Sequence, residues 1–167
     1  VAGSPESVRD VLRRGEEQGI RGRLLPVACA FHTPRMEAAR APLAQLAVQR
    51  LTGDPAIPVF ANLDAQPHPA DPRAVAERLG DHVVQPVRFA EMIKAMRDRG
   101  ARVFVEVGPG STLGNLISSI LEDDKHLAVS CDGRAGRSSL VNLLHALARL
   151  AAAGVTLDLD LPAPGRS

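Results

Sequence analysis

Aromatic residues are scarce in this chain, which has no tryptophan, no tyrosine and only four phenylalanines among 167 residues. Proteins that bind single-stranded nucleic acids stack the bases on aromatic side chains, and few are available here. An excess of one charge is also lacking, because 20 lysines and arginines face 19 aspartates and glutamates, giving a formal net charge of +1. Without a positive excess to neutralise phosphates, binding to nucleic acid or to an anionic membrane is not expected.

Cysteines and long hydrophobic runs are also few. Cys29 and Cys131 are the only cysteines, too few and too far apart for a disulfide scaffold or a zinc site. No stretch of about 18 apolar residues occurs, and the first residues do not resemble an export signal. These features predict a protein of the reducing cytoplasm without a membrane segment. The first residue is Val1 instead of methionine, which suggests a piece of a longer polypeptide.

The remaining composition is that of a folded domain, with 45% hydrophobic and 23% charged residues. Apolar residues at helical spacing alternate with short apolar runs, and this order predicts an α/β fold. The predicted strands are residues 21–31, 57–63, 103–107 and 126–132. The predicted helices are the segment between Ser4 and Gly19 and residues 35–51, 73–84, 86–100, 111–122 and 139–155.

A glycine turn joins the predicted strand at residues 103–107 to the helix that follows. Gly108, Pro109 and Gly110 break the strand, and Ser111 is available as the cap of the helix. A glycine loop that opens a helix can also bind phosphate. Because the segment lacks the lysine and the spacing of a phosphate-binding loop, a structural turn is the favoured interpretation.

The acidic residues do not predict a catalytic pair or a metal site. Glu106 lies within a predicted strand, with no second carboxylate placed to work with it, so a structural or hydrogen-bonding role is expected. Asp123, Asp124 and Asp132 are expected to be solvated or turn residues. No metal is therefore predicted.

His32 is the only histidine placed where a predicted strand ends in a loop, a position at which functional side chains are commonly displayed. An imidazole, whose unperturbed pKa is about 6.5, can take a proton from a hydroxyl and return it to a leaving group. A single histidine beside an apolar run is nevertheless more often structural. The local sequence alone leaves both interpretations open.

Three short motifs in a fixed order favour the functional interpretation: "CAFHTPRME", "QPVRFAEMI" and "VFVEVGPGSTL". Together they resemble the C-terminal part of the malonyl/acyl-CoA:acyl carrier protein transacylases, and more narrowly an acyltransferase domain of a polyketide or polyunsaturated-lipid synthase. The resemblance runs from Val1 to about Asp132, and more loosely to Leu161. It implies half of a ferredoxin-like small subdomain at residues 1–27, the C-terminal part of an α/β-hydrolase-like large subdomain at 28–132, and a post-acyltransferase helix and linker at 133–167.

The resemblance also implies a reaction. In the family a serine in a Gly-His-Ser-x-Gly elbow attacks the acyl-CoA thioester, activated by a histidine that His32 matches. The acyl group then passes to the phosphopantetheine thiol of an acyl carrier protein. Acyl-CoA, the carrier protein and neighbouring synthase domains are therefore the expected partners. No cofactor of the domain's own is expected.

A second family feature concerns the orientation of the histidine. In the family a backbone carbonyl just before the "PVRF"-like motif orients it, and by position this carbonyl falls near His82. The side-chain type of His82 should then be immaterial. A polar residue at a helix end is an equally compatible interpretation of His82.

The residues before His32 resemble a selectivity motif. Relatives that take malonyl units often carry His-Ala-Phe-His, whereas those that take methylmalonyl often carry Tyr-Ala-Ser-His. Here the residues are Cys29, Ala30, Phe31 and His32, so three of four match the malonyl type. Phe31 would fill the space that an α-methyl branch needs, a bias worth about 1 to 3 kcal/mol. Cys29 departs from the pattern.

The nucleophile of this reaction is absent. No Gly-x-Ser-x-Gly occurs in the sequence, and neither does the family's arginine for the extender carboxylate. The chain alone is therefore expected to be inactive, with an exposed apolar surface. The alternative is a noncatalytic docking or scaffold module of a multidomain synthase, in which the apolar helix Ser139–Val155 and the tail contact neighbouring domains.

Overall fold

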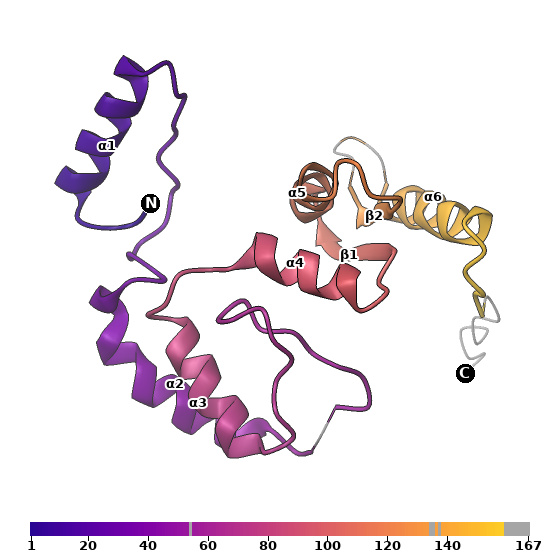
Figure 1. Ribbon diagram of the computed structural model, residues 1–167, viewed down its shortest axis with the longest axis horizontal. Helices are drawn as coiled ribbons and strands as arrows, with labels where there is room; N and C mark the ends of the chain where they lie inside the picture. Colours follow the sequence, from indigo (N-terminus) through magenta and orange to yellow (C-terminus); the bar gives the residue numbers. More distant parts are fainter. Residues whose placement is uncertain (54, 134–135, 137, 159–167) are drawn as a thin grey trace, which may run out of the picture. The chain divides into compact units, whose positions relative to one another are not determined.

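The computed structural model describes residues 1–53, 55–133, 136 and 138–158. Contacts divide the chain into two compact units, Val1–Met92 and Ile93–Ser167. The elements in chain order (Figure 1) are α1 (Pro5–Glu17), the 3-10 helix η1 (Pro34–Met36), α2 (Glu37–Arg50), α3 (Pro72–His82), α4 (Phe89–Asp98), β1 (Val103–Pro109), α5 (Thr112–Ile120), β2 (Leu127–Asp132) and α6 (Ser139–Ala152).

Each predicted helix forms, and the first one shows why local sequence was sufficient. The Ser4 hydroxyl accepts a hydrogen bond from the Ser7 N–H at 3.2 Å, and Pro5 occupies the first helical position. Gly19, with φ of 74°, follows the end of α1 in the left-handed conformation that glycine adopts readily. Capping and termination are thus encoded within a few residues of each end.

Helices α2 and α3 approach each other closely at Gly80. A Cβ atom at Gly80 would lie 2.8 Å from the Arg40 carbonyl oxygen and 3.2 Å from the Ala44 Cβ, so a larger residue would force the helices apart. An ion pair between Arg40 and Asp81 joins the same two helices. These contacts fix the last turn of α3, which contributes to the candidate site below.

Two predicted strands are wrong. Residues 21–31 form no strand, and residues 57–63 contribute only an isolated bridge between Phe60 and Pro67. The structure describes all of residues 21–31, and the one backbone hydrogen bond within this segment is local, from the Val27 N–H to the Leu25 carbonyl. Pro26 has no N–H to donate. An apolar run predicts burial, but a strand also requires a neighbouring strand to pair with.

The second unit contains a β-α-β arrangement. β1 and β2 run parallel, with Val103 opposite Leu127 and Val105 opposite Val129. Helix α5 connects them, and both α5 and α6 contact β2 (Figure 1). Buried apolar side chains from these elements form the core: Phe104, Ile117, Leu121, Val129, Ala146 and Leu150. The predicted α/β class is confirmed here, whereas the subdomain boundaries stay a prediction.

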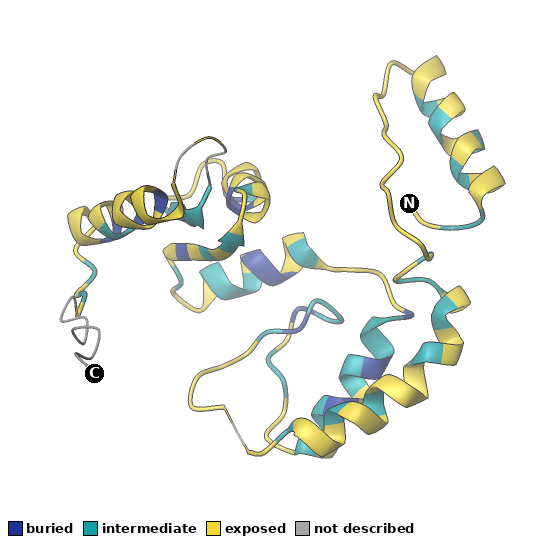
Figure 2. Ribbon diagram, turned by 180° about the vertical axis from the view of Figure 1, so that it is seen from behind, coloured by how far each residue is buried: buried dark blue, intermediate teal, exposed yellow. Residues whose placement is uncertain are grey.

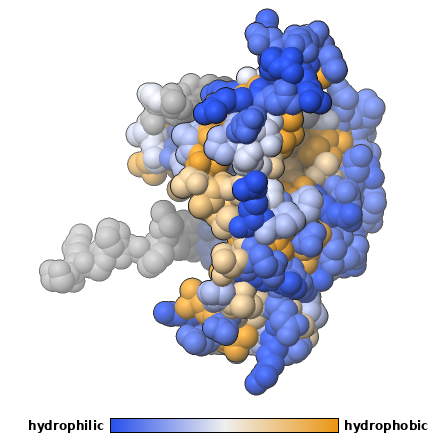
Figure 3. Space-filling view, turned by 90° about the vertical axis from the view of Figure 1, so that its left-hand side faces the viewer, coloured by the Kyte–Doolittle hydropathy of each residue, from blue (hydrophilic) through white to orange (hydrophobic). Residues whose placement is uncertain are grey.

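Many residues of both units are exposed. The fully described helices α1 and α2 contain no buried residue (Figure 2). Leu25 and Val27 are 64% and 61% exposed, as is Leu140 of α6 at 64%. Figure 3 shows hydrophobic side chains at the surface among hydrophilic ones. The apolar exposure expected from the sequence is therefore present.

Membrane-spanning character is missing from the helices of the described residues. No helix there combines the length and the apolar character needed to cross a bilayer.

Candidate active site around His32

His32 lies in the turn before η1, and its backbone has a φ of 62°, in the left-handed region that few non-glycine residues adopt. Two hydrogen bonds hold it there. Its N–H donates to the Val83 carbonyl at 2.9 Å, and its ring Nδ1 lies 2.8 Å from the His82 carbonyl oxygen. The backbone and the ring of His32 are thus held by two consecutive carbonyls.

The C-terminal end of α3 explains why these carbonyls are available. The last carbonyls of a helix have no donor in a following turn. The N–H groups of Val83 and Val84 turn back to the carbonyls of Gly80 and Asp81, whereas the next two carbonyls accept from His32. This end of a helix also carries partial negative charge. It therefore stabilises positive charge on the His32 ring.

The hydrogen bond from the ring determines which nitrogen can act as a base. A carbonyl oxygen only accepts hydrogen bonds, so Nδ1 of His32 carries the hydrogen. In the neutral ring Nε2 then keeps its lone pair. Such an imidazole can accept a proton at Nε2 from a hydroxyl or thiol and become an imidazolium beside the end of α3.

Thr33 supports the His32 turn and was missed by the sequence analysis. Its hydroxyl donates to the Ala30 carbonyl at 2.7 Å and accepts from the Arg35 N–H at 3.3 Å. Thr33 is the cap of η1, and Pro34 occupies the first position of that helix. A threonine directly before a proline is a recognisable start of a helix, so this signal was present in the sequence.

His82 contributes a ring as well as a carbonyl. The ring centroids of His32 and His82 are 5.0 Å apart, with the planes inclined by 46°. Burial is the main reason why the pKa of His82 is lowered, and the nearby His32 and His68 lower it further. The His82 ring therefore remains neutral at neutral pH and adds no second positive charge beside His32.

The predicted selectivity residues lie in the same turn. Cys29 is exposed, Ala30 is half-buried, and Phe31 is 45% exposed. The Phe31 ring is therefore accessible to a ligand.

A half-buried polar group lies in the same unit as His32. Arg78 makes two hydrogen bonds to Asp64, at 2.7 and 2.8 Å, and the bond from Arg78 is the main reason why the pKa of Asp64 is lowered. Among the described residues, four buried side-chain atoms have no hydrogen-bond partner: Asn62 Oδ1, His68 Nδ1, Arg78 Nε and His82 Nε2. The backbone carbonyl of Asn62 accepts from the Arg88 N–H at 2.8 Å, which links this group to the "QPVRF" motif.

Glu106 caps α5, so the hydrogen-bonding role predicted for it is confirmed. Its carboxylate accepts from the N–H groups of Gly114 at 2.8 Å and Leu113 at 3.1 Å, and from the Ser130 hydroxyl at 2.9 Å. The predicted cap, Ser111, occupies the cap position but makes no capping hydrogen bond with its side chain. A carboxylate is the stronger acceptor, and its negative charge at the helix start disfavours a phosphate there.

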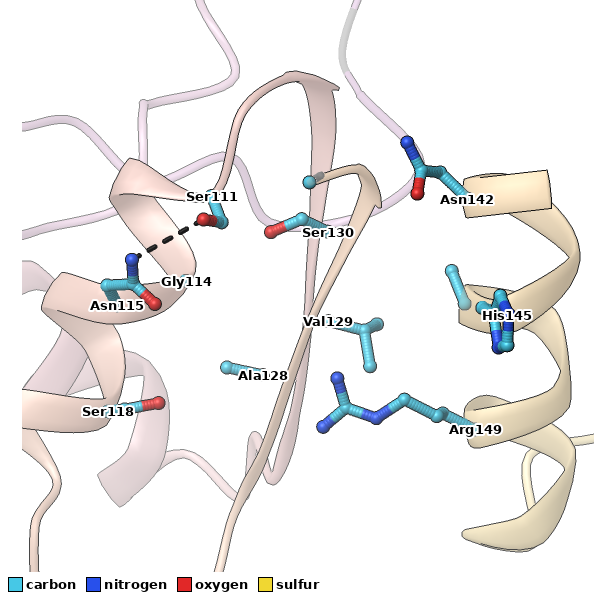
Figure 4. A pocket seen from close by; sticks show the side chains of 12 residues that line it. Ser111, Gly114, Asn115, Ser118, Ala128, Val129, Ser130, Asn142, His145 and Arg149 are labelled. Atoms are coloured by element: carbon cyan, nitrogen blue, oxygen red, sulfur yellow. Dashed lines mark hydrogen bonds between the residues drawn. The ribbon is translucent and has the colours of Figure 1, made fainter. Parts of the chain in front are cut away.

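A cavity of about 410 Å³ lies between α5 and α6. Residues Ala128, Val129 and Ser130 of β2 line it between the two helices, and Arg149 of α6 extends into it (Figure 4). His145 is also on its wall, but no hydrogen bond joins this histidine to a serine among the residues that the structure describes. The cavity therefore lacks a prepared nucleophile and base.

Of the three aspartates predicted to be solvated or turn residues, Asp123 is exposed in a turn, whereas Asp124 and Asp132 make side-chain contacts. The Asp132 carboxylate accepts from the Asn142 amide at 2.8 Å and from the Ser139 hydroxyl at 3.0 Å, joining β2 to α6. Asp124 pairs with Arg97. Across the described ranges there is no group of three or more histidine, cysteine, aspartate or glutamate side chains that could hold a metal ion.

Similar sequences identify the family of this chain. The acyl transferase domain family matches residues 1–156. The chain belongs to this family. A polyunsaturated fatty acid synthase polypeptide from Thraustochytrium sp. is 32% identical over 163 residues, covering 95% of this chain and 6% of that protein. The family resemblance predicted from the three motifs is confirmed.

Solved structures agree. The acyltransferase domain from the second module of the salinomycin polyketide synthase is 30% identical, with a TM-score of 0.80 over 92% of this chain and 36% of that one. A malonyl-CoA:acyl carrier protein transacylase from Xanthomonas oryzae pv. oryzae is 30% identical, with a TM-score of 0.68 over 77% of this chain and 40% of that one. The chain thus spans less than half of either structure.

Proposed function

We propose that this chain supplies the general base of an acyltransferase domain. The domain would move a malonyl-type group from coenzyme A to the phosphopantetheine thiol of an acyl carrier protein, through an acyl-serine intermediate. The observation that carries the proposal is the hydrogen bond from His32 Nδ1 to the His82 carbonyl, because it leaves Nε2 as the basic nitrogen. The subdomain assignment and the cytoplasmic location predicted from the sequence belong to this proposal.

The first half-reaction loads the enzyme. Nε2 of His32 takes the proton of the serine hydroxyl while the serine oxygen attacks the thioester carbon. The carbon–sulfur bond then breaks, and the coenzyme A thiolate leaves with the proton returned by Nε2. The C-terminal end of α3 stabilises the imidazolium that exists between these two proton transfers.

The second half-reaction moves the acyl group from the serine to the carrier protein by the same steps in reverse. The carrier's phosphopantetheine thiol gives its proton to Nε2, and its sulfur attacks the acyl-serine ester. The carbon–oxygen bond to serine breaks, and Nε2 returns the proton to the serine oxygen. Neither half requires a metal or a redox cofactor. A malonyl-transacylase whose structure is similar to this chain is solved in complex with the acyl carrier protein of a type II polyketide synthase, which supports this partner.

The serine is proposed to lie in a segment of the polypeptide outside this chain. No Gly-x-Ser-x-Gly occurs here, and the chain spans 36% to 40% of the two related structures described above. We refer to this chain together with that segment as the longer polypeptide. Incubated with malonyl-CoA and a carrier protein, the longer polypeptide should transfer the acyl group, and this chain alone should not. Transfer by this chain alone would contradict the proposal.

A docking role is the second candidate, favoured by the surface of α6. Leu140, Leu143 and Leu144 are large hydrophobic residues of this helix that remain exposed. Acyl transfer by the longer polypeptide separates the two candidates, since a purely structural module would show none.

Replacing Phe31 with serine is expected to relax selectivity for the acyl group. The shorter side chain leaves room for an α-methyl branch, so the preference for malonyl-CoA over methylmalonyl-CoA should fall by about 5- to 150-fold, equivalent to 1 to 3 kcal/mol. The measurement is kcat/KM for each thioester with the longer polypeptide. Replacement of the exposed Val27 with serine serves as the control for a nearby change outside the selectivity motif. An unchanged ratio in the Phe31→Ser variant would remove Phe31 from the selectivity site.

A further inference from the structure

We propose that the side chain of His82 is a positioning residue for His32. Its half-buried ring packs against the His32 ring and holds it in the rotation at which Nδ1 reaches the His82 carbonyl. The inference rests on the proposed role of His32 as the base. It departs from the sequence-based expectation that only the backbone of His82 matters.

The hydrogen bond alone leaves the His32 ring incompletely fixed. The terminal torsion of a histidine side chain has broad, roughly two-fold minima. Rotation of the ring by half a turn would place a carbon atom, instead of Nδ1, at the His82 carbonyl. Nδ1 would then no longer need to carry the hydrogen. A second ring at a centroid distance of 5.0 Å, inclined by 46°, restricts this rotation through direct packing.

His82 is itself held firmly enough to do this. It is the last residue of α3, whose final turn is fixed against α2 by the close approach at Gly80. Its own carbonyl and the next one are already bound to His32. The carbonyl and the packing ring therefore belong to one residue and move together.

The chemistry of the His82 ring suits a neighbour that becomes charged. His82 Nε2 is buried and has no hydrogen-bond partner among the described residues, so the ring is not held by a competing contact there. The groups that act electrostatically on His82 are His32 and His68, and Arg78 and Asp64 act in turn on His68. A neutral ring can pack beside the His32 imidazolium without adding repulsion.

Three substitutions separate the ring from the carbonyl, because each keeps the backbone of residue 82. His82→Phe keeps a flat ring, His82→Gln keeps a polar side chain without a ring, and His82→Ala removes both. The exposed His145 of α6 provides a matched control, His145→Phe. The readout is the tautomer of His32, measured from its ring ¹⁵N chemical shifts in this chain.

The expected tautomer of His32 depends on whether residue 82 keeps a ring. His82→Phe and His145→Phe should keep the Nδ1–H tautomer of His32, whereas His82→Gln and His82→Ala should raise the Nε2–H fraction several-fold. Wild-type tautomer fractions in the glutamine and alanine variants would overturn the inference. So would a phenylalanine variant, folded by its amide spectrum, that behaves like the alanine variant.

Kinetic measurements on the longer polypeptide provide a second test of the role of the His82 ring. His82→Ala should lower kcat for acyl transfer by about 10- to 100-fold, with KM for malonyl-CoA nearly unchanged, because the base is displaced while substrate binding is retained. His82→Phe should restore most of kcat. If His32→Ala leaves transfer intact, the proposed function fails. If His32→Ala abolishes transfer but His82→Ala changes neither kcat nor the tautomer, only the present inference fails.

Discussion

Replacing His32 with alanine is expected to slow acyl transfer by the longer polypeptide about 10²- to 10⁴-fold, the usual contribution of a positioned general base. The structure gives this histidine a defined tautomer through the His82 carbonyl, at 2.8 Å from Nδ1. Alanine removes the only group proposed to take the serine proton. The loss should fall on kcat and kcat/KM alike, since the ring acts on the reacting proton rather than on binding.

The measurement is the initial rate of malonyl transfer to a carrier protein at neutral pH. The rate of His32→Ala should fall below that of wild type by the stated factor. His145→Ala is the control, because His145 is an exposed histidine of the other unit. Equal rates in wild type and His32→Ala would remove His32 from the mechanism.

Replacing Glu106 with glutamine is expected to destabilise the β1–α5 region by roughly 1.5 to 3 kcal/mol, the range for hydrogen bonds to charged groups. The carboxylate accepts from two amides at the start of α5 and from Ser130. Glutamine has one acceptor oxygen in place of two and no charge to match the helix start. Amide hydrogen exchange at Leu113 and Gly114 should accelerate, and Glu122→Gln, on an exposed residue, is the control.

The same contribution of Glu106 should depend on pH. Desolvation is the largest single influence and raises its pKa, but the hydrogen bonds from Gly114, Leu113 and Ser130 together outweigh it, so the pKa of Glu106 is lowered from 4.5. A lowered folded-state pKa contributes stability that is present above the ordinary value and lost as the pH falls through the folded value. The difference in unfolding free energy between wild type and Glu106→Gln should therefore shrink below about pH 4.5. A constant difference would contradict this assignment.

The helices were predictable because their signals are local. Ser4 and Pro5 start α1, and Gly19 follows its end, all within the segment itself. The prediction of strands at residues 21–31 and 57–63 was wrong because strand pairing depends on distant segments. An apolar run does not reveal whether a partner strand is present. β1 and β2 were predicted correctly, since a helix between them supplies the crossover that parallel pairing needs.

The candidate site was predictable only through the order of its motifs. That order pointed to His32 and to a carbonyl near His82, 50 residues apart, and the structure places these atoms in hydrogen-bonding distance. It did not reveal that Glu106 rather than Ser111 caps α5, because a residue eight positions before Gly114 is brought there by the turn. The packing of the His82 ring on His32 likewise depends on the end of α3, a tertiary contact.

The central claim is that the C-terminal end of α3 prepares His32 as a base whose free lone pair is on Nε2. The most direct test is the ¹⁵N spectrum of the His32 ring in this chain, recorded at a pH where the ring is neutral. The account predicts a protonated Nδ1 and an unprotonated Nε2. A ring found mainly with the proton on Nε2 would contradict it, because that nitrogen could not then accept the proton of a nucleophile.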